Sequence, residues 1–369
     1  MMEIPLLNFV PMHSEIKSDM QQAFNRVYES NRFVLGEEVR QFEKSYATFN
    51  QVEHCVGLSN GLDALHLSLK ALGIKEGDEV LLPSNTYIAT ALAVSHVGAK
   101  PVFVEPNIDT YNIDVKCIDA AITTKTKVIM PVHLYGQSCE MENVMEIAHE
   151  NNLFVIEDNA QAQGASFNNK LTGSWGHVNA TSYYPGKNLG AIGDAGAVTT
   201  QSEELATKIK TLRNYGSNKK YYNEILGYNM RLDELQAAFL SVKLGKIHEW
   251  TRQRIEIASW YDEDLKGVSD LILPKTAEKA THVYHLFVVR TSKRNELQKY
   301  LNEKGIGTLI HYPIVPHMQE ALKFLDHKKN DFPIAERIAE TCLSLPLWPG
   351  LLREEVSYVS KCIKFFLRS

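Results

Sequence analysis

The sequence predicts an α/β protein with a parallel sheet covered by helices on both faces, followed by a smaller α+β domain. Short apolar runs rich in Val, Ile, Leu and Phe alternate with helix-like segments before residue 160. These runs are EVLLP (79–83), PVFVE (101–105), KVIMPVHL (127–134) and LFVIED (153–158). Strands that alternate with helices favour a parallel sheet, because each crossover places a helix on one face of the sheet. The alternation ends near residue 245, which indicates a second domain.

The segments between these runs carry apolar residues at helical spacing. A strand-like HCVGL precedes a predicted helix at 61–72, and two further helices are predicted at 88–97 and 141–150. AGAVTT (195–200) is predicted as one more strand. The N-terminal part of the chain thus repeats a strand-then-helix pattern, as expected for a doubly covered sheet.

The C-terminal third has a different pattern. Its predicted elements are a long amphipathic helix at 231–250, a strand at 285–290 (HLFVVR) and helices at 295–304 and 335–343. A chain of 369 residues is also too long for one simple core. We therefore predict a large domain over residues 1–245 and a small domain over residues 246–369.

Composition narrows the class of protein. The formal net charge is −5, so no global basic field favours nucleic acid or anionic lipid as a partner. Five widely spaced cysteines without a C-x-x-C pair favour a reduced, cytoplasmic protein. We expect no signal peptide, because the first residues lack a basic region and a long apolar core. No apolar run approaches the ~20 residues of a membrane helix, so no membrane partner is expected.

One glycine-rich stretch, SYYPGKNLGAIGDAGAVTT (182–200), holds a single lysine, Lys187. It is not a Walker loop, because Asn188 follows Gly186-Lys187 where Ser or Thr is required. It is not a dinucleotide loop either, because the glycines are spaced G-x-x-G-x-x-G and lead into a strand. The remaining explanations are a covalent amine or an ordinary surface turn.

Other polar residues follow neighbouring strands and favour the covalent amine. Asp158 ends one strand and could hold a ring-nitrogen proton, while Ser59-Asn60-Gly61 opens a helix whose free amides favour phosphate. Ser182 adds a hydroxyl, and Tyr87 offers a flat face for stacking. Each residue alone also has a structural explanation as a cap, a loop hydroxyl or a packing group. Together they match pyridoxal 5′-phosphate (PLP), whose aldehyde forms a Schiff base with lysine.

The chain resembles the DegT-type sugar-nucleotide aminotransferases, which are PLP enzymes. The resemblance covers nearly the whole chain and rests on several long motifs in the family's order. These motifs are SNGLDAL (59–65), PSNTYIAT (83–90), PVHLYGQ (131–137), EDNAQ (157–161), SYYPGKNLGAIGDAGA (182–197), LRNYGS (212–217), GYNMRLDELQAAFL (227–240) and HYPIVPH (311–317). The resemblance implies the aspartate aminotransferase fold (fold type I), with a mostly parallel seven-stranded sheet in the large domain.

The resemblance also implies roles for individual residues. Lys187 would bind the cofactor covalently and move protons, and Asp158 would pair with the pyridinium nitrogen. The other implied cofactor contacts are Gln161 near the ring hydroxyl, Tyr87 on the ring face, and Gly61, Leu62 and Ser182 at the phosphate. Asn229 would reach the phosphate bound by a second subunit, which implies a homodimer with shared active sites.

The motifs most resemble the branch that aminates C-3 of a dTDP-3-oxo-6-deoxyhexose, with L-glutamate as amino donor. Such enzymes make 3-amino-3,6-dideoxy sugars for surface polysaccharides and glycosylated metabolites. The resemblance places Tyr184, His311 and His317 along the sugar-nucleotide site and Lys219 at the pyrophosphate. His311 could instead be a core histidine and Lys219 a surface lysine. We expect no metal, because His311 and His317 have no cysteine or carboxylate nearby to complete a site.

Three alternatives stay open at the level of sequence. The first is amination at C-4 of a related nucleotide 4-keto sugar, which needs nearly the same site. The second is a non-catalytic PLP-binding regulator, and the third is a plain nucleotide-binding module. Lys187 argues against the branch of the family that has histidine there and acts as a dehydratase. Asn159 replaces an alanine that is common in the family, and we interpret it as tolerated.

Overall fold

The computed structural model describes residues 3–368, and its centre is a seven-stranded sheet. The strand order is β1-β9-β8-β5-β4-β2-β3. The strands are β1 (His54–Leu58), β2 (Glu79–Pro83), β3 (Lys100–Val104), β4 (Thr126–Ile129), β5 (Phe154–Asp158), β8 (Val178–Ser182) and β9 (Gly196–Thr200). β9 pairs antiparallel with both of its neighbours, while the other pairs are parallel. The predicted fold class, a mostly parallel sheet of seven strands flanked by helices, is confirmed.

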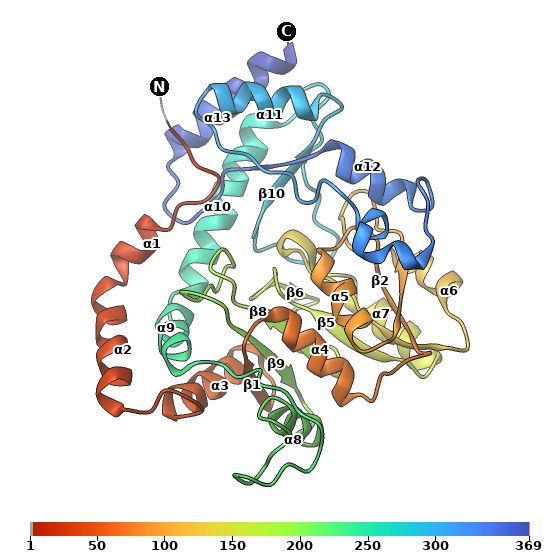
Figure 1. Cartoon of the computed structure of the whole chain (residues 1–369). Coiled ribbons are helices and arrows are strands. Elements are labelled where there is room, and N and C mark those ends of the chain that lie inside the picture. The colour runs from red at the N-terminus through yellow and green to blue at the C-terminus, as the bar shows by residue number, and fades with distance from the viewer. Residues whose placement is uncertain (1–2, 369) are drawn as a thin grey trace.

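Helices cover both faces of this sheet (Figure 1). Alternate residues of a strand point to opposite faces, so Val80 and Leu82 of β2 join one core while Leu81 joins the other. α4 (Gly61–Ala71), α5 (Ile88–His96) and α8 (Glu203–Leu212) pack on the first face. α6 (Ile118–Ala121) and α7 (Met141–Glu150) pack on the second.

The N-terminal helices and α9 form a third layer at the β1 edge. They are α1 (Val10–Glu15), α2 (Lys17–Ser30), α3 (Glu37–Asn50) and α9 (Glu234–Leu244). Phe42 and Tyr46 of α3 pack with Leu232 and Leu240 in one buried cluster. Figure 1 shows α1 and α2 along the outer edge of the molecule, beside α9.

The C-terminal part has its own core. It contains α10 (Ile247–Leu265), β10 (Phe287–Arg290), α11 (Arg294–Glu303), α12 (Pro333–Thr341), β11 (Cys342–Leu345) and α13 (Arg353–Arg368), with β10 antiparallel to β11. The predicted boundary after residue 245 falls between α9 and α10, and it stays a prediction. Ile4 packs in the C-terminal core and pairs with Ile306, so the first residues lie with the small domain rather than the large one.

Some predicted elements differ in extent. The single helix at 231–250 is two helices, because Gly245 ends α9 and α10 begins at Ile247. The strand predicted at 127–134 ends at Ile129, shortly before Pro131, which has no N–H to donate. The helix predicted at 335–343 ends at Thr341, and the chain continues directly into β11. Among residues 3–368, no helix is both long enough and apolar enough to cross a membrane.

A buried carboxylate fixes the end of β5. Glu157 is fully buried and accepts hydrogen bonds from the amides of Gly173, Trp175 and Gly176. His133 Nε2 donates a fourth bond at 2.7 Å, since its Nδ1 accepts the amide of Cys139. These donors lower the pKa of Glu157 even though burial opposes ionisation. Glu157 therefore ties β5 to the loop before β8.

Replacing Glu157 by Gln should destabilise the protein by about 3 kcal/mol or more. The NH2 group of the new side chain would face backbone or histidine N–H groups that now donate to a carboxylate oxygen. The matched change of exposed Glu256 to Gln should cost less than about 0.5 kcal/mol. Urea unfolding measures both. Because the folded pKa of Glu157 is lowered, its stabilisation is present above the unfolded pKa and is lost as pH falls through the folded pKa. Equal stabilities of the two variants would contradict this role.

Candidate active site

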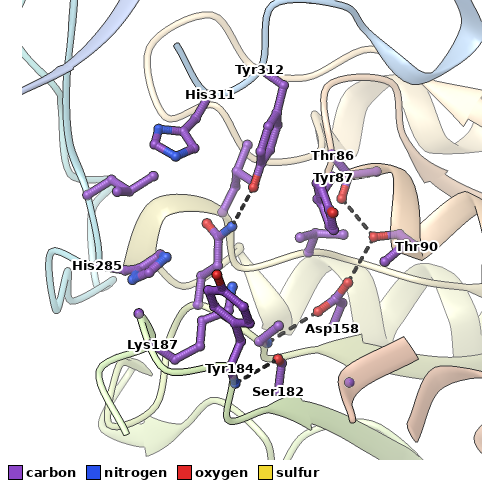
Figure 2. Close-up of a pocket in the computed structure, with 18 of the residues that line it drawn as sticks. Thr86, Tyr87, Thr90, Asp158, Ser182, Tyr184, Lys187, His285, His311 and Tyr312 are labelled. Carbon is purple, nitrogen blue, oxygen red and sulfur yellow. Dashed lines mark hydrogen bonds between the residues drawn. The ribbon is translucent and has the colours of Figure 1, made fainter. Parts of the chain in front are cut away.

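A cavity lies at the carboxyl ends of β5 and β8, where ligands bind in open α/β sheets. Its volume is about 700 Å³. The loops after these strands and the N-termini of α4 and α5 form one side, while residues 309–312 and 345–347 close the other (Figure 2). The cavity therefore lies where the sheet meets the C-terminal elements.

Lys187 enters this cavity from the tight loop between β8 and β9. The Lys187 amide donates to the carbonyl of Tyr184 at 2.8 Å, which closes a turn. A Cβ on Gly190 would lie 2.2 Å from the carbonyl oxygen of Pro185, so only glycine fits this turn. Burial lowers the pKa of the Lys187 amine to about 8, although the charge of Asp158 acts in the opposite direction. A substantial fraction of the amine is therefore unprotonated near neutral pH.

Asp158 is the last residue of β5 and lines the same cavity. Its Oδ2 accepts the hydroxyl of Thr90 at 2.9 Å, and its Oδ1 accepts the amide of Ala160 at 3.2 Å. Burial raises the pKa of the Asp158 carboxyl, and these two donors and the charge of Lys187 lower it. The cavity thus holds one buried carboxylate near one buried amine, a pair that polarises whatever lies between.

The N-terminus of α4 forms the floor beside Ser182. Asn60 caps the helix by accepting the amide of Asp63 at 2.8 Å, and the amides of Gly61 and Leu62 come before the first intrahelical acceptor. A Cβ on Gly61 would lie 2.5 Å from Cβ of Ser182, so glycine allows β8 and the helix to approach closely. Free amides, a hydroxyl and a helix dipole form a binding site for phosphate.

Aromatic and amide side chains form the upper wall of the cavity. Tyr87 is half exposed, with its ring centre 5.2 Å from that of Tyr312. Gln161 accepts the amide of Tyr135 at 2.6 Å and donates to the Tyr312 hydroxyl at 3.0 Å. Its amide is therefore fixed in one orientation at the cavity wall.

Two histidines line the cavity in neutral form. Burial and the nearby Lys187 lower the pKa of His311 to about 4 and that of His285 well below its ordinary value. His311 Nδ1 lies 2.8 Å from the hydroxyl of Ser344. The second ring nitrogen of His311 can then act as a neutral hydrogen-bonding group toward a ligand.

The structure brings most of the predicted residues together and leaves three apart. The cavity is lined by Gly61, Leu62, Tyr87, Asp158, Gln161, Ser182, Tyr184, Lys187 and His311. Lys219 and Asn229 are exposed on the segment after α8, outside this cavity. His317 lies in an aromatic cluster with Phe103 and Phe332, where it bonds Glu336 at 3.1 Å. We therefore leave His317 out of the proposed substrate contacts.

Sequence reasoning missed several polar cavity residues, among them Thr86, Thr90, His285 and Tyr312. Thr86 and Thr90 lie on either side of Tyr87 in the motif PSNTYIAT, and Thr90 lies in the first turn of α5. Polar residues that open a helix after a strand end were a usable signal for them. Tyr312 and His285 come from the C-terminal region, and only the tertiary fold shows that His285 lies beside Lys187 and Tyr312 beside Gln161 (Figure 2).

The residues present fit a pyridoxal phosphate site. A phosphate would bind the amides at the α4 N-terminus and Ser182, and the Tyr87 face would pack on the ring. Asp158 would hold the ring nitrogen, and the Lys187 amine can attach the aldehyde covalently. These features define the class of protein as a PLP-dependent enzyme of fold type I.

Comparison with known proteins identifies the family. Residues 14–364 match the model of the DegT/DnrJ/EryC1/StrS aminotransferase family. A dTDP-3-amino-3,6-dideoxy-alpha-D-galactopyranose transaminase of Aneurinibacillus thermoaerophilus is 50% identical over 98% of each chain. A "pleiotropic regulatory protein" of Geobacillus stearothermophilus is 43% identical over 100% of this chain and 99% of that protein. The chain belongs to the DegT/DnrJ/EryC1/StrS aminotransferase family.

Solved structures agree with this assignment. The crystal structure of S. venezuelae DesV matches with a TM-score of 0.98 at 41% identity, over 100% of both chains. NtdA from Bacillus subtilis, solved with bound cofactor PMP, matches with a TM-score of 0.93 at 31% identity, over 100% of this chain and 86% of that one. The protein is a PLP-dependent sugar aminotransferase.

Two lysines have a pKa that burial lowers to about 8, Lys187 in the cavity and Lys243 on α9, and they provide a matched test. After incubation with PLP and borohydride reduction, peptide mass mapping should find the cofactor on Lys187 and not on Lys243. The rate of capture by apoprotein should rise about tenfold for each pH unit below about 8 and then level off, because only the neutral amine reacts. Labelling of Lys243, or a flat pH profile, would contradict the assignment.

Proposed function

We propose that this protein moves an amino group from L-glutamate to C-3 of a dTDP-3-oxo-6-deoxyhexose. The products would be dTDP-3-amino-3,6-dideoxyhexose and 2-oxoglutarate. The observation that carries the proposal is the 50% identity, over nearly the full length, to a transaminase named for a dTDP-3-amino-3,6-dideoxy sugar. The choice of C-3 and of glutamate goes beyond the family assignment.

The proposed chemistry divides between two groups of the cavity. When bound, the cofactor supplies an electron sink for the carbon that loses its proton. The negative charge of buried Asp158 would keep the ring nitrogen of the bound cofactor protonated. Lys187, with a pKa of about 8, is matched to taking a proton at one carbon and returning it at another. We assign Lys187 and Asp158 as the catalytic residues.

Sugar binding is assigned to the wall opposite Asp158. The half-exposed ring of Tyr184 and the neutral ring of His311 both line the cavity and can bind sugar hydroxyl or keto oxygens. Amination at C-4 of a 4-keto sugar would use the same groups with the sugar turned. No contact in the cavity favours that turned orientation, so C-3 stays the first choice on the basis of the similar transaminase.

The second class of function considered is a PLP-binding regulator. The chain is 43% identical to a protein named as a pleiotropic regulator, so this name alone does not separate the two classes. The cavity does provide an argument, because a lysine amine with a lowered pKa beside a buried carboxylate serves group transfer and is unnecessary for ligand sensing. We therefore favour the enzyme.

We further propose a homodimer with shared active sites. Among the described residues that line the cavity, Lys187 is the one Lys or Arg side chain, yet a nucleotide diphosphate sugar brings two negative charges. The segment 215–227 carries exposed Lys219 together with exposed Tyr221 and Leu226, and exposed Asn229 follows it. A second copy that inserted this segment would bury its apolar side chains and supply the missing cation.

Addition of L-glutamate alone should bleach the yellow band of the PLP-loaded protein, and 2-oxoglutarate should appear in equal amount. Excess dTDP-3-oxo-6-deoxyhexose should then restore the band, whereas a 4-keto isomer should restore it at least about tenfold more slowly. Spectroscopy and mass spectrometry of the sugar product measure this. Restoration by the 4-keto sugar alone would establish the C-4 reaction, and no response to glutamate would refute the donor.

Lys187→Ala should abolish turnover, and Asn229→Ala should lower it strongly through weaker cofactor binding. If sites are shared, a mixed dimer of the two variants contains one site with both residues intact. Random exchange at equal amounts should then recover about a quarter of wild-type activity. Lys246→Ala, on the surface, should behave as wild type when mixed with Lys187→Ala. No recovery from a mixture shown to contain mixed dimers would contradict shared sites.

A further inference from the structure

Two threonine hydroxyls, Thr86 and Thr90, form a series of hydrogen bonds that ends on Asp158, which we call the threonine relay. Thr90 Oγ1 lies 2.9 Å from Asp158 Oδ2, and Thr86 Oγ1 lies 2.8 Å from Thr90 Oγ1 (Figure 2). Both threonines are buried, with 1% of each residue exposed, and Asp158 is 6% exposed. Both threonines lie at the start of α5, whereas Asp158 is the last residue of β5. The Asp158 carboxylate is therefore held by a different element from its own strand.

The negative charge of Asp158 fixes which hydroxyl donates in each of these hydrogen bonds. An ionised carboxylate can only accept, so Thr90 must give its one hydroxyl proton to Asp158. Thr90 then has only lone pairs left for its neighbour, and Thr86 must be the donor in the second bond. Each bond polarises the next, so a buried chain that ends on a charge is stronger than its separate bonds.

We propose that Thr90, supported by Thr86, is a positioning residue that holds the Asp158 carboxylate ionised and aimed at the ring nitrogen of the cofactor. The inference rests on the proposed role of Asp158. The geometry leaves Oδ1 with the Ala160 amide at 3.2 Å and Oδ2 with Thr90, so rotation of the carboxylate would break both bonds. Without the hydroxyl, burial would favour the protonated, neutral form of Asp158.

Other groups act on Asp158 and must be held constant in a test. Lys187 faces it from the loop after β8 and His133 from the segment after β4. Tyr312 and Cys139 lie within its electrostatic reach. None of these changes in a threonine variant, so differences between variants report on the hydroxyls.

The test compares Thr90→Val, Thr90→Ser, Thr86→Val and Asp158→Asn with a control, Thr200→Val. Thr200 is also buried, and its hydroxyl bonds to backbone groups, donating to the carbonyl of His177 at 2.7 Å and accepting the amide of Ser202 at 3.1 Å. The first measurement is the pH midpoint of the visible band of each PLP-loaded protein. The second is the apparent melting temperature of each apoprotein at about pH 8 and about pH 5, which requires no cofactor.

We expect Thr90→Val to displace the pH midpoint in the same direction as Asp158→Asn, Thr86→Val to do so less, and Thr90→Ser to restore it. Because the folded pKa of Asp158 is raised, its ionisation costs stability, and this cost begins as pH rises through the unfolded pKa and is complete above the folded pKa. Thr90→Val should therefore lower the melting temperature by about 2 °C more at about pH 8 than at about pH 5. Thr200→Val should lower it equally at both and leave the band unchanged.

Thr90→Val behaving like Thr200→Val, while Asp158→Asn moves the band, would overturn the relay and leave the proposed function intact. A band that Asp158→Asn does not move would overturn the role of Asp158 and the relay with it. If Thr90→Val does not fold, Thr86→Val decides, and an unshifted midpoint in that variant overturns the relay.

Discussion

The alternation of side chains along β5 is the constraint on which the site depends. Glu157 and Asp158 are consecutive acids, so the strand turns them to opposite faces. Glu157 is saturated by three amides and His133, whereas Asp158 keeps an open side toward the cavity. The buried network on one face thus fixes the position of the Asp158 carboxylate on the other. A shift of one residue in β5 would exchange the two roles.

Charge in the cavity is kept to a minimum by burial. Lys187 and Asp158 oppose each other, while His285 and His311 are held neutral because burial and the lysine both disfavour a second positive charge. A neutral imidazole can orient a sugar oxygen without drawing the Asp158 carboxylate away from the ring nitrogen. Under the proposed function, this arrangement would separate substrate orientation from the Lys187–Asp158 pair, which is a reason for the upper wall to contain histidine and tyrosine rather than lysine.

Features of the fold and site that depend on neighbouring residues in the sequence could be predicted, and those that depend on distant residues could not. The end of β5 with Asp158 follows from a short apolar run, and Lys187 stands out as the single lysine of a glycine-rich stretch. β8 was not predicted, because its sequence VNATS is not an apolar run. The break at Gly245 was missed because apolar spacing continues across it. The packing of Ile4 against the C-terminal core, and of Tyr312 against Gln161, joins residues far apart in the chain. No local pattern indicates such contacts, so only the folded structure reveals them.

The positions of Lys219 and Asn229 follow a different logic from those of the cavity residues. A single chain supplies the lysine, the carboxylate and the amides for the cofactor phosphate, and the structure leaves the two remaining residues exposed. If a second chain supplies them, Lys219 would serve nucleotide binding and Asn229 would add a contact to the cofactor phosphate. Changes in the segment 215–227 would then act on affinity for the nucleotide sugar, whereas changes at Thr90 or Asp158 would act on the chemical step. The shared site would make assembly of the dimer a condition for substrate binding, and cofactor attachment at Lys187 would still be possible in either chain alone.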